Sequence, residues 1–326
     1  MMPTRAPTRA TPARRWMQPL RAIGLPALAG LLVWLAAATI NWLTDALGLS
    51  SIDVLLLFAQ LVLVPLGMPL LAVRTALGRS LMLLAWYVFR FAAFGLVLSV
   101  LLPIGPLSAA VAAPWLVFAG VIGLGGLASF AGSSPRGLRE FARLAAAGAV
   151  AGAALIYVLY RAGVPFPGFS DAIVELTAVH YTATGYGAVL VGAMVQQHAE
   201  GSGRRAASAA LVALLAGLVV TPIGFIAIPA RQVVGALLVV SGLVGIVSVT
   251  GWLLLRGAVA ASARPWLAIS AASGIGVAAL AATYAVTEAA GSPWPPIPVM
   301  AVTHGVLAAI GLLGCGLIGW RLAGRA

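Results

Sequence analysis

Long runs of apolar residues dominate the chain, and each run ends at a short polar, glycine-containing or proline-containing segment. Ten runs can be read from the sequence, at about 23–41, 53–73, 80–102, 107–130, 141–160, 171–197, 206–228, 233–255, 266–286 and 299–320. Each is close to the ~20 residues that an α-helix needs to cross ~30 Å of hydrocarbon. The pattern predicts an all-α protein, a polytopic transmembrane helical bundle of about ten spans.

The composition agrees with a membrane protein. Of 326 residues, 62% are hydrophobic and 8% are charged, and the mean hydropathy is +1.08. These values lie far outside those of ordinary soluble domains. The single cysteine, Cys315, excludes an internal disulfide and a multi-cysteine metal site.

The basic residues are all arginines, and their placement tests the count of ten spans. They fall before the first run and in every second connection, at Arg5, Arg9, Arg14, Arg15, Arg21, Arg74, Arg79, Arg136, Arg139, Arg143, Arg204, Arg205, Arg256, Arg264, Arg321 and Arg325. Only Arg161 and Arg231 fall in connections of the other set. By the positive-inside rule, both termini are expected in the cytoplasm.

The net charge of +12 could also indicate nucleic-acid binding, because arginines neutralise phosphates. Arginines beside spans are what the orientation rule requires, so we attribute the charge to topology and to anionic lipid instead. Residues 1–20 are expected to form a basic, disordered cytoplasmic arm, and residues 21–326 a single transmembrane domain. We expect a multi-pass protein of the cell inner (plasma) membrane, with membrane lipids as partners and no nucleic acid.

Two histidines, His180 and His304, lie near the start of the sixth and tenth runs. A polar ring in hydrocarbon costs free energy unless it is hydrogen-bonded, so each is a candidate site residue. The alternative is that both histidines only hold neighbouring helices together through hydrogen bonds.

Other polar residues are expected to meet these histidines from the second and sixth runs. Asp53 and Gln60 lie in the second run, and Glu175 lies ahead of His180 in the sixth. Helical spacing places a stripe of polar side chains on one face of the sixth run, formed by Thr177, His180, Tyr181 and Thr184. Asp171, Glu175 and Thr182 form an adjacent stripe, and Tyr186 follows.

Arg90 lies near the middle of the third run. A lone guanidinium at mid-bilayer costs at least ~2.5 kcal/mol, so Arg90 is expected to face the bundle and pair with an acid, with Glu175 the first choice. Such a pair could fix helix register or bind a substrate anion.

The sequence lacks the motifs typical of serine hydrolases, phosphate-binding loops and metal sites. There is no G-x-S-x-G segment, and a phosphate loop of the G-x-x-x-x-G-K type cannot form without lysine. Two histidines and a carboxylate could form a three-ligand metal site, but no short His-x-x-His or His-x-x-x-His spacing supports one. We therefore expect no metal and no cofactor.

Four segments together carry a family resemblance. They are Ile52-Asp53 leading to Pro65-Leu66-Gly67, Leu176-Thr177-Ala178-Val179-His180-Tyr181, His304-Gly305 ahead of Gly311, and Gly319-Trp320. In these segments the chain resembles the YndJ-like family of bacterial membrane proteins. Members tend to read Leu-Thr-Ala-Val-His-Phe-His-Tyr-Ala-Gly-Phe at the second segment, where this chain has Thr182 and Tyr186 in place of the second histidine and last phenylalanine. The family is largely uncharacterised and its members are sometimes labelled transporters, so the resemblance implies the site's location more than an activity.

The leading hypothesis is an intramembrane enzyme that acts on a lipid-phase substrate, with isoprenoids as one class, in a pocket open toward the outer leaflet. His180 and Glu175 would perform acid–base chemistry, and His304 would orient the substrate or share the proton. Substrate contacts would come from Arg90, Tyr181, Thr177, Thr184, Tyr186, Asp53 and Gln60. The alternatives are a proton-coupled transporter of a small solute and a structural or accessory membrane protein.

Overall fold

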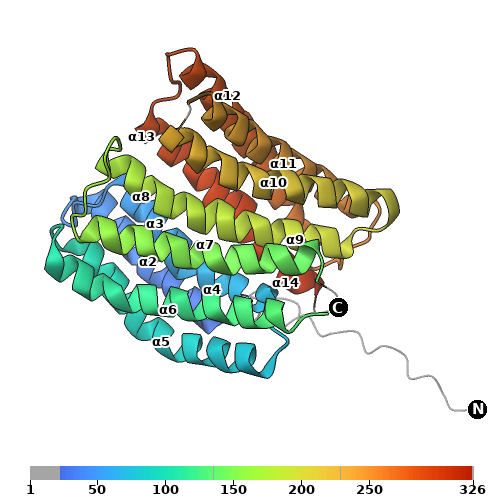
Figure 1. Cartoon of the computed structure of the whole chain (residues 1–326), viewed down its shortest axis with the longest axis horizontal. Helices are drawn as coiled ribbons and strands as arrows, with labels where there is room; N and C mark the ends of the chain where they lie inside the picture. Colours follow the sequence, from blue (N-terminus) through green and yellow to red (C-terminus); the bar gives the residue numbers. More distant parts are fainter. Residues whose placement is uncertain (1–22, 135, 228, 325–326) are drawn as a thin grey trace, which may run out of the picture.

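The computed structural model describes residues 23–134, 136–227 and 229–324, and these residues form ten helical rods without a strand. The rods run roughly side by side across the molecule (Figure 1). The predicted all-α bundle of about ten helices is therefore confirmed. The predicted N-terminal arm, residues 1–20, lies outside the described residues.

Seven rods are single α-helices. Their bounds are α2 Leu25–Thr44, α5 Ala76–Leu101, α6 Pro106–Ala131, α7 Leu138–Arg161, α10 Gly201–Ala227, α11 Pro229–Leu255 and α12 Arg264–Ala289. Each lies within a few residues of a predicted run, because the length of an apolar run is a local property that the sequence states directly.

The other three rods change their winding along their length. The first comprises α3 Ser51–Phe58, η1 Ala59–Leu63, α4 Val64–Gly67 and η2 Met68–Leu71. The second comprises α8 Asp171–His180, η3 Tyr181–Ala188 and α9 Val189–His198. The third comprises α13 Ile297–Met300, η4 Ala301–Gly305, η5 Leu307–Gly314 and α14 Cys315–Ala323. Segments η1, η3, η4 and η5 are π-helical, and π-helical turns occur frequently at functional sites.

These three composite rods form the centre of the bundle. Segments η1, η3 and η5 contact one another, α7 packs on the second rod and α12 packs on the third. In Figure 1 the α5–α6–α7 group lies on one side of them and the α10–α11–α12 group on the other. The apolar window of the first composite rod is 89% buried, against 11% for α2 at the periphery.

Nine of the described helices are long and apolar enough to cross a membrane, which indicates a multi-pass membrane protein. The second composite rod is not among them. It carries Glu175, His180 and the polar residues that follow, so its mean hydropathy is lower. The part of this rod after Thr184 lies among the other helices, since residues 185–195 are buried without exception.

Arginines gather at one end of the rods. The turns at 72–75 and 256–263, together with residues 132–134 and 136–137 and the end of α14, lie at this arginine-rich end. The turns at 45–50, 102–105, 162–170 and 290–296 lie at the opposite end. The alternation used to count the spans therefore holds for the described helices, and the cytoplasmic placement of the arginine-rich end stays a prediction.

Candidate functional site

Asp53 and Glu175 meet at the opposite end of the bundle, where α3 packs on α8. Asp53 first has a structural role: its Oδ2 accepts hydrogen bonds from Ser50 N (2.9 Å) and Ser50 Oγ (2.7 Å), which completes a capping box at the start of α3. The Asp53 carboxyl group also interacts electrostatically with Glu175, which is 5% exposed. Two carboxylates that share a site repel each other, so the pair favours holding one proton.

Arg161 is the cation that faces this carboxyl pair. The arginine is 5% exposed, and its Nε donates a 2.7 Å hydrogen bond to Ser108 Oγ while its Nη2 donates to the Leu102 carbonyl. It therefore ties the end of α7 to the turn between α5 and α6. Oε1 of Glu175 has no hydrogen-bond partner among the described residues, so this buried carboxyl group is incompletely satisfied.

Arg90 is not placed beside Glu175, and the expected pair is corrected here. The Arg90 side chain is exposed on the outer face of α5, with its guanidinium 5.7 Å from the centre of the Phe91 ring. Its neighbour Phe89 points into the bundle instead and is 7% exposed. The rotation of α5 about its own axis decides which of these residues faces inward.

Gln60 occupies the middle of the bundle in a fully buried network. Trp115 Nε1 donates to Gln60 Oε1 (3.1 Å), and Gln60 Nε2 donates to Thr182 Oγ1 (3.0 Å). Thr182 Oγ1 in turn donates to the Ala178 carbonyl at 3.1 Å. All three side chains have no exposed surface, so the network joins the second, fourth and sixth spans away from water.

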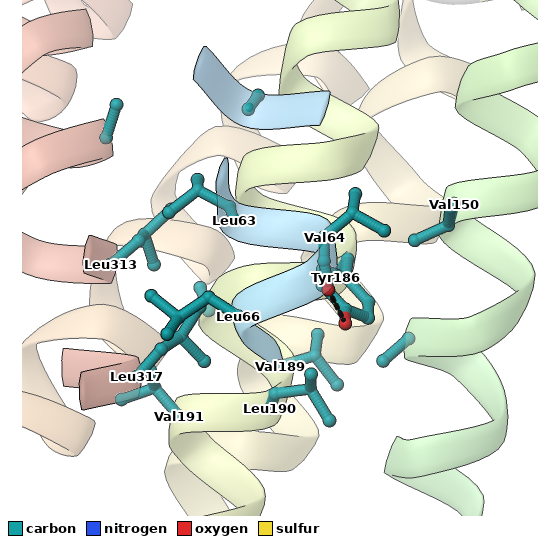
Figure 2. Close-up of a cluster of buried hydrophobic side chains, with 14 of the residues drawn as sticks. Leu63, Val64, Leu66, Val150, Tyr186, Val189, Leu190, Val191, Leu313 and Leu317 are labelled. Carbon is teal, nitrogen blue, oxygen red and sulfur yellow. Dashed lines mark hydrogen bonds between the residues drawn. The ribbon is translucent and has the colours of Figure 1, made fainter. Parts of the chain in front are cut away.

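Tyr186 continues the same row of contacts toward the arginine-rich end. Its hydroxyl donates a 2.7 Å hydrogen bond to the Val64 carbonyl, among the apolar side chains drawn in Figure 2. Further along, Arg321 Nη1 donates to the Leu66 carbonyl at 3.2 Å. We call this row the polar seam, formed by Asp53–Glu175, Gln60–Thr182, Val64–Tyr186 and Leu66–Arg321. The polar seam runs between the first composite rod and its neighbours from one end of the bundle to the other.

His180 lies on a different side of α8 from Glu175, and His304 lies in η4. His180 is exposed and its Nδ1 lies 2.8 Å from the Leu176 carbonyl, while His304 is half-buried with Nδ1 3.2 Å from the Val277 carbonyl. The two imidazoles interact electrostatically. Five residues separate Glu175 from His180, a rotation of about 140° around an α-helix. The structure thus separates the carboxyl groups of Asp53 and Glu175 from the two histidines, of which His180 is exposed and His304 is half-buried.

The remaining predicted residues of the sixth span have local contacts. Thr177 Oγ1 donates to the Ile173 carbonyl of its own helix at 2.7 Å. The Tyr181 ring packs over Gly152 of α7, where an added Cβ would lie 3.6 Å from the ring. Thr184 is half-buried. These residues therefore belong to the second composite rod but do not join the polar seam.

A cavity of about 310 Å³ opens between α2, α3 and the η4–η5 segment. Its walls include Trp34, Phe58, Val302, Val306 and Ile310. The last three are 54%, 42% and 40% exposed, so the cavity faces the region that lipid would occupy. Neither the carboxyl pair nor the histidines line it.

Three residues of the site were not chosen from the sequence. Arg161 had a signal, because it was one of two arginines on the unexpected side of the membrane. The sequence signal for Thr182 was weaker: it lies on the same polar stripe as Glu175. Trp115 had none, since a tryptophan in an apolar run is usual. Among the described residues, no group of three or more His, Cys, Asp or Glu side chains is arranged to hold a metal ion.

Comparison with known proteins identifies the family. The model of the family described as YndJ-like protein matches residues 54–312. This range covers most of the chain and includes Gln60, Glu175, His180, Tyr186 and His304. No curated protein matches the chain, and no solved structure matches it. The match and the fold together show that this chain belongs to the YndJ-like family.

Proposed function

We propose that this protein is a proton-coupled transporter of a small solute, with the carboxyl pair Asp53–Glu175 as its proton-binding site. One observation carries the proposal: the Glu175 carboxyl group is buried in the helical bundle with one oxygen, Oε1, unpartnered, and Asp53 interacts with it from the start of α3. Ionisable groups within membrane spans are costly and typically mark proton relays or substrate paths. A pair that only fixed helix register would be expected to satisfy its buried oxygens.

Arg161 gives the pair two alternative states. With one proton on the pair, Asp53 and Glu175 would share it, and Arg161 would keep its bonds to Ser108 and Leu102. When the proton leaves, two carboxylates repel each other and attract the guanidinium. Proton release would therefore pull the end of α7 toward α8. This motion provides the coupling between protonation and helix position that a transporter requires.

The central rods supply the helices that could move. Three π-helical segments, η1, η3 and η5, meet at the middle of the bundle. Close contacts there depend on small residues, because a Cβ at Gly185 would lie 2.8 Å from Ala149 and one at Gly187 would lie 3.2 Å from Leu313. Small contact surfaces allow helices to slide or rock with little side-chain rearrangement.

Transport can be tested in vesicles. The purified protein is reconstituted with a pH-sensitive dye inside, and proton movement is followed while small solutes (amino acids, sugars and organic acids) are added in turn outside. The wild type is expected to move protons in response to a solute, and Glu175→Gln is expected to lose at least nine-tenths of this rate. Gln keeps the size of the side chain but cannot release a proton.

Thr177→Val is the matched control in the same helix. Thr177 bonds only to its own backbone at Ile173, so this variant should keep the wild-type rate. Wild-type flux in a correctly folded Glu175→Gln protein would overturn the role of the carboxyl pair. Solute uptake without proton movement would overturn proton coupling itself.

A second function is favoured by a separate observation, the exposure of His180, whose imidazole lies within electrostatic range of the half-buried His304. An accessible imidazole next to a second one could perform acid–base chemistry on a lipid-phase substrate. The test is mass spectrometry of small molecules that co-purify with wild type, His180→Ala and His304→Ala. A lipid-like species lost from both folded variants would support an enzyme, and equal content in all three would count against it.

The proposal includes location and orientation. A multi-pass protein with arginines concentrated at one end is expected in the inner (plasma) membrane, with that end in the cytoplasm. The carboxyl pair would then lie in the outer half of the bilayer and Arg321 at the cytoplasmic side.

A further inference from the structure

The outer face of α5 carries a regular stripe of large apolar side chains. The α5 stripe consists of Leu84, Tyr87, Phe91, Phe94, Leu98 and Leu101, which are 46%, 66%, 68%, 71%, 36% and 45% exposed. Their spacing alternates between three and four residues. This is the repeat with which one helix packs lengthwise against another in a coiled coil. Tyr87 lies away from both ends of α5, although tyrosine normally gathers at the membrane interfaces.

Arg90 borders the α5 stripe on its exposed side. It lies 14 residues after Ala76 and 11 residues before Leu101, the first and last residues of α5, so it is close to the middle of the span. A guanidinium there costs at least ~2.5 kcal/mol without compensation. In the heptad defined by the α5 stripe, Arg90 occupies the position that flanks the apolar contact and carries charges that select the partner. The exposed arginine therefore calls for an acidic group on a helix that packs on α5.

A second copy of the chain cannot supply that acid. The sequence has seven acidic residues, Asp45, Asp53, Glu140, Asp171, Glu175, Glu200 and Glu288. Six of them lie in turns or within the first or last few residues of a helix, and Glu175 is buried against α3. No acid of this chain is both exposed and near the middle of a span. A symmetric contact through α5 would also bring two arginines together, which is unfavourable.

We propose that the α5 stripe is the docking surface for a single transmembrane helix of another membrane protein, whose mid-span carboxylate pairs with Arg90. Phe91 and Phe94 would be the main anchors, because large aromatic side chains provide much contact area with few rotatable bonds. This inference does not depend on the proposed transport activity, since α5 lies at the periphery and contributes no side chain to the carboxyl pair.

The interaction can be measured with the full-length protein and a defined peptide. The labelled protein is placed in phosphatidylcholine vesicles at pH 8 with a labelled polyleucine transmembrane peptide that carries one glutamate at its centre. Energy transfer reports association, and peptides with glutamine or leucine at the same position are compared. The wild type is expected to bind the glutamate peptide at least about threefold more tightly than the leucine peptide, a factor typical of polar contacts between membrane helices. Arg90→Leu should abolish the preference, and Phe91→Ala/Phe94→Ala should weaken binding of every peptide.

Arg79→Leu is the control, since Arg79 lies on the same helix at the arginine-rich end and bonds to the Arg74 carbonyl. This variant should keep the preference for glutamate. Equal binding of glutamate and leucine peptides by the wild type would overturn the proposal, and indicate that Arg90 reaches lipid phosphate instead. A preference that survives in Arg90→Leu, or one that glutamine satisfies as well as glutamate, would contradict the ion pair.

Discussion

The hydroxyl group of Tyr186 donates a 2.7 Å hydrogen bond to the backbone carbonyl of Val64, across the contact between the first and second composite rods. The ring reaches this position because Gly67 has no side chain: a Cβ there would lie 2.7 Å from the Tyr186 oxygen. The segment that contains Pro65 and Gly67 thus packs closely against the Tyr186 side chain. In Figure 2 the bond lies within apolar side chains from both rods, so water cannot replace it.

Gly67→Ala should therefore destabilise the protein. The Tyr186 side chain is fully buried and its hydroxyl is bonded to the backbone, so it cannot move away from the added methyl group without losing the bond. Overpacking of this kind typically costs about 1–3 kcal/mol. Thermal unfolding in detergent, followed by circular dichroism, is the measurement.

The control for this substitution is Gly148→Ala in α7, where an added Cβ meets nothing within 4 Å. That variant should be as stable as the wild type or slightly more stable, because alanine has the higher helix propensity. The double variant Gly67→Ala/Tyr186→Leu should recover part of the loss. If Gly67→Ala alone unfolded at the wild-type temperature, the packing of Tyr186 on Gly67 would be refuted.

The hydrogen bond between Gln60 and Thr182 should be detectable as a coupling energy. Thr182→Val leaves the buried Gln60 amide without its acceptor, and Gln60→Leu removes both of its bonds. In a double-mutant cycle the stability loss of the pair should be smaller than the sum of the single losses. Interhelical hydrogen bonds in membranes give coupling of about 0.6–1.7 kcal/mol. A coupling of zero within error would mean that the two side chains contribute independently.

Removal of Arg161 should loosen the end of the bundle that carries the carboxyl pair. Arg161→Met keeps most of the apolar stem but loses the donors to Ser108 Oγ and the Leu102 carbonyl. Hydrogen bonds to charged groups contribute a net ~1.5–3 kcal/mol each, so a loss of at least ~2 kcal/mol is expected in thermal unfolding. Arg79→Met, which removes one exposed bond, should cost much less, and equal losses would argue against the buried role of Arg161.

The ten helices could be predicted from the sequence because run length and arginine alternation are local features. The same holds for Gln60 and Glu175, since a polar residue within an apolar run is visible without a structure. The composite rods containing them pack together, as the shared placement of their polar residues suggested. Which of these polar side chains contact each other was harder to predict from the sequence, because the contacts depend on how each helix is rotated about its axis.

Arg90 and Arg161 illustrate that limit. Arg90 was expected inside the membrane at a depth near that of Glu175, and its mid-span placement made it the natural partner. Arg161 is the arginine close to Glu175 in sequence. Phe89 and Arg90 are neighbours on α5, but Phe89 faces inward and Arg90 faces outward. Because α5 is only weakly amphipathic, its sequence does not indicate which residue faces the bundle. Arg161 was assigned to a connection, although it is the last residue of α7 and is buried there.

Membrane orientation can be tested with single cysteines in a Cys315→Ala background. Ser134 lies in the turn after α6 at the arginine-rich end, and Ser292 lies in the turn before α13 at the opposite end; both are exposed. The positive-inside rule places Arg136 and its neighbours in the cytoplasm. A membrane-impermeant maleimide should therefore label Ser292→Cys in intact cells, and Ser134→Cys only after permeabilisation. The reverse result would invert the bundle, and would move the Asp53–Glu175 pair from the outer to the inner half of the bilayer. Because a proton-coupled transporter exposes its carboxyl pair to both sides in turn, the orientation decides from which side the proton first reaches Glu175.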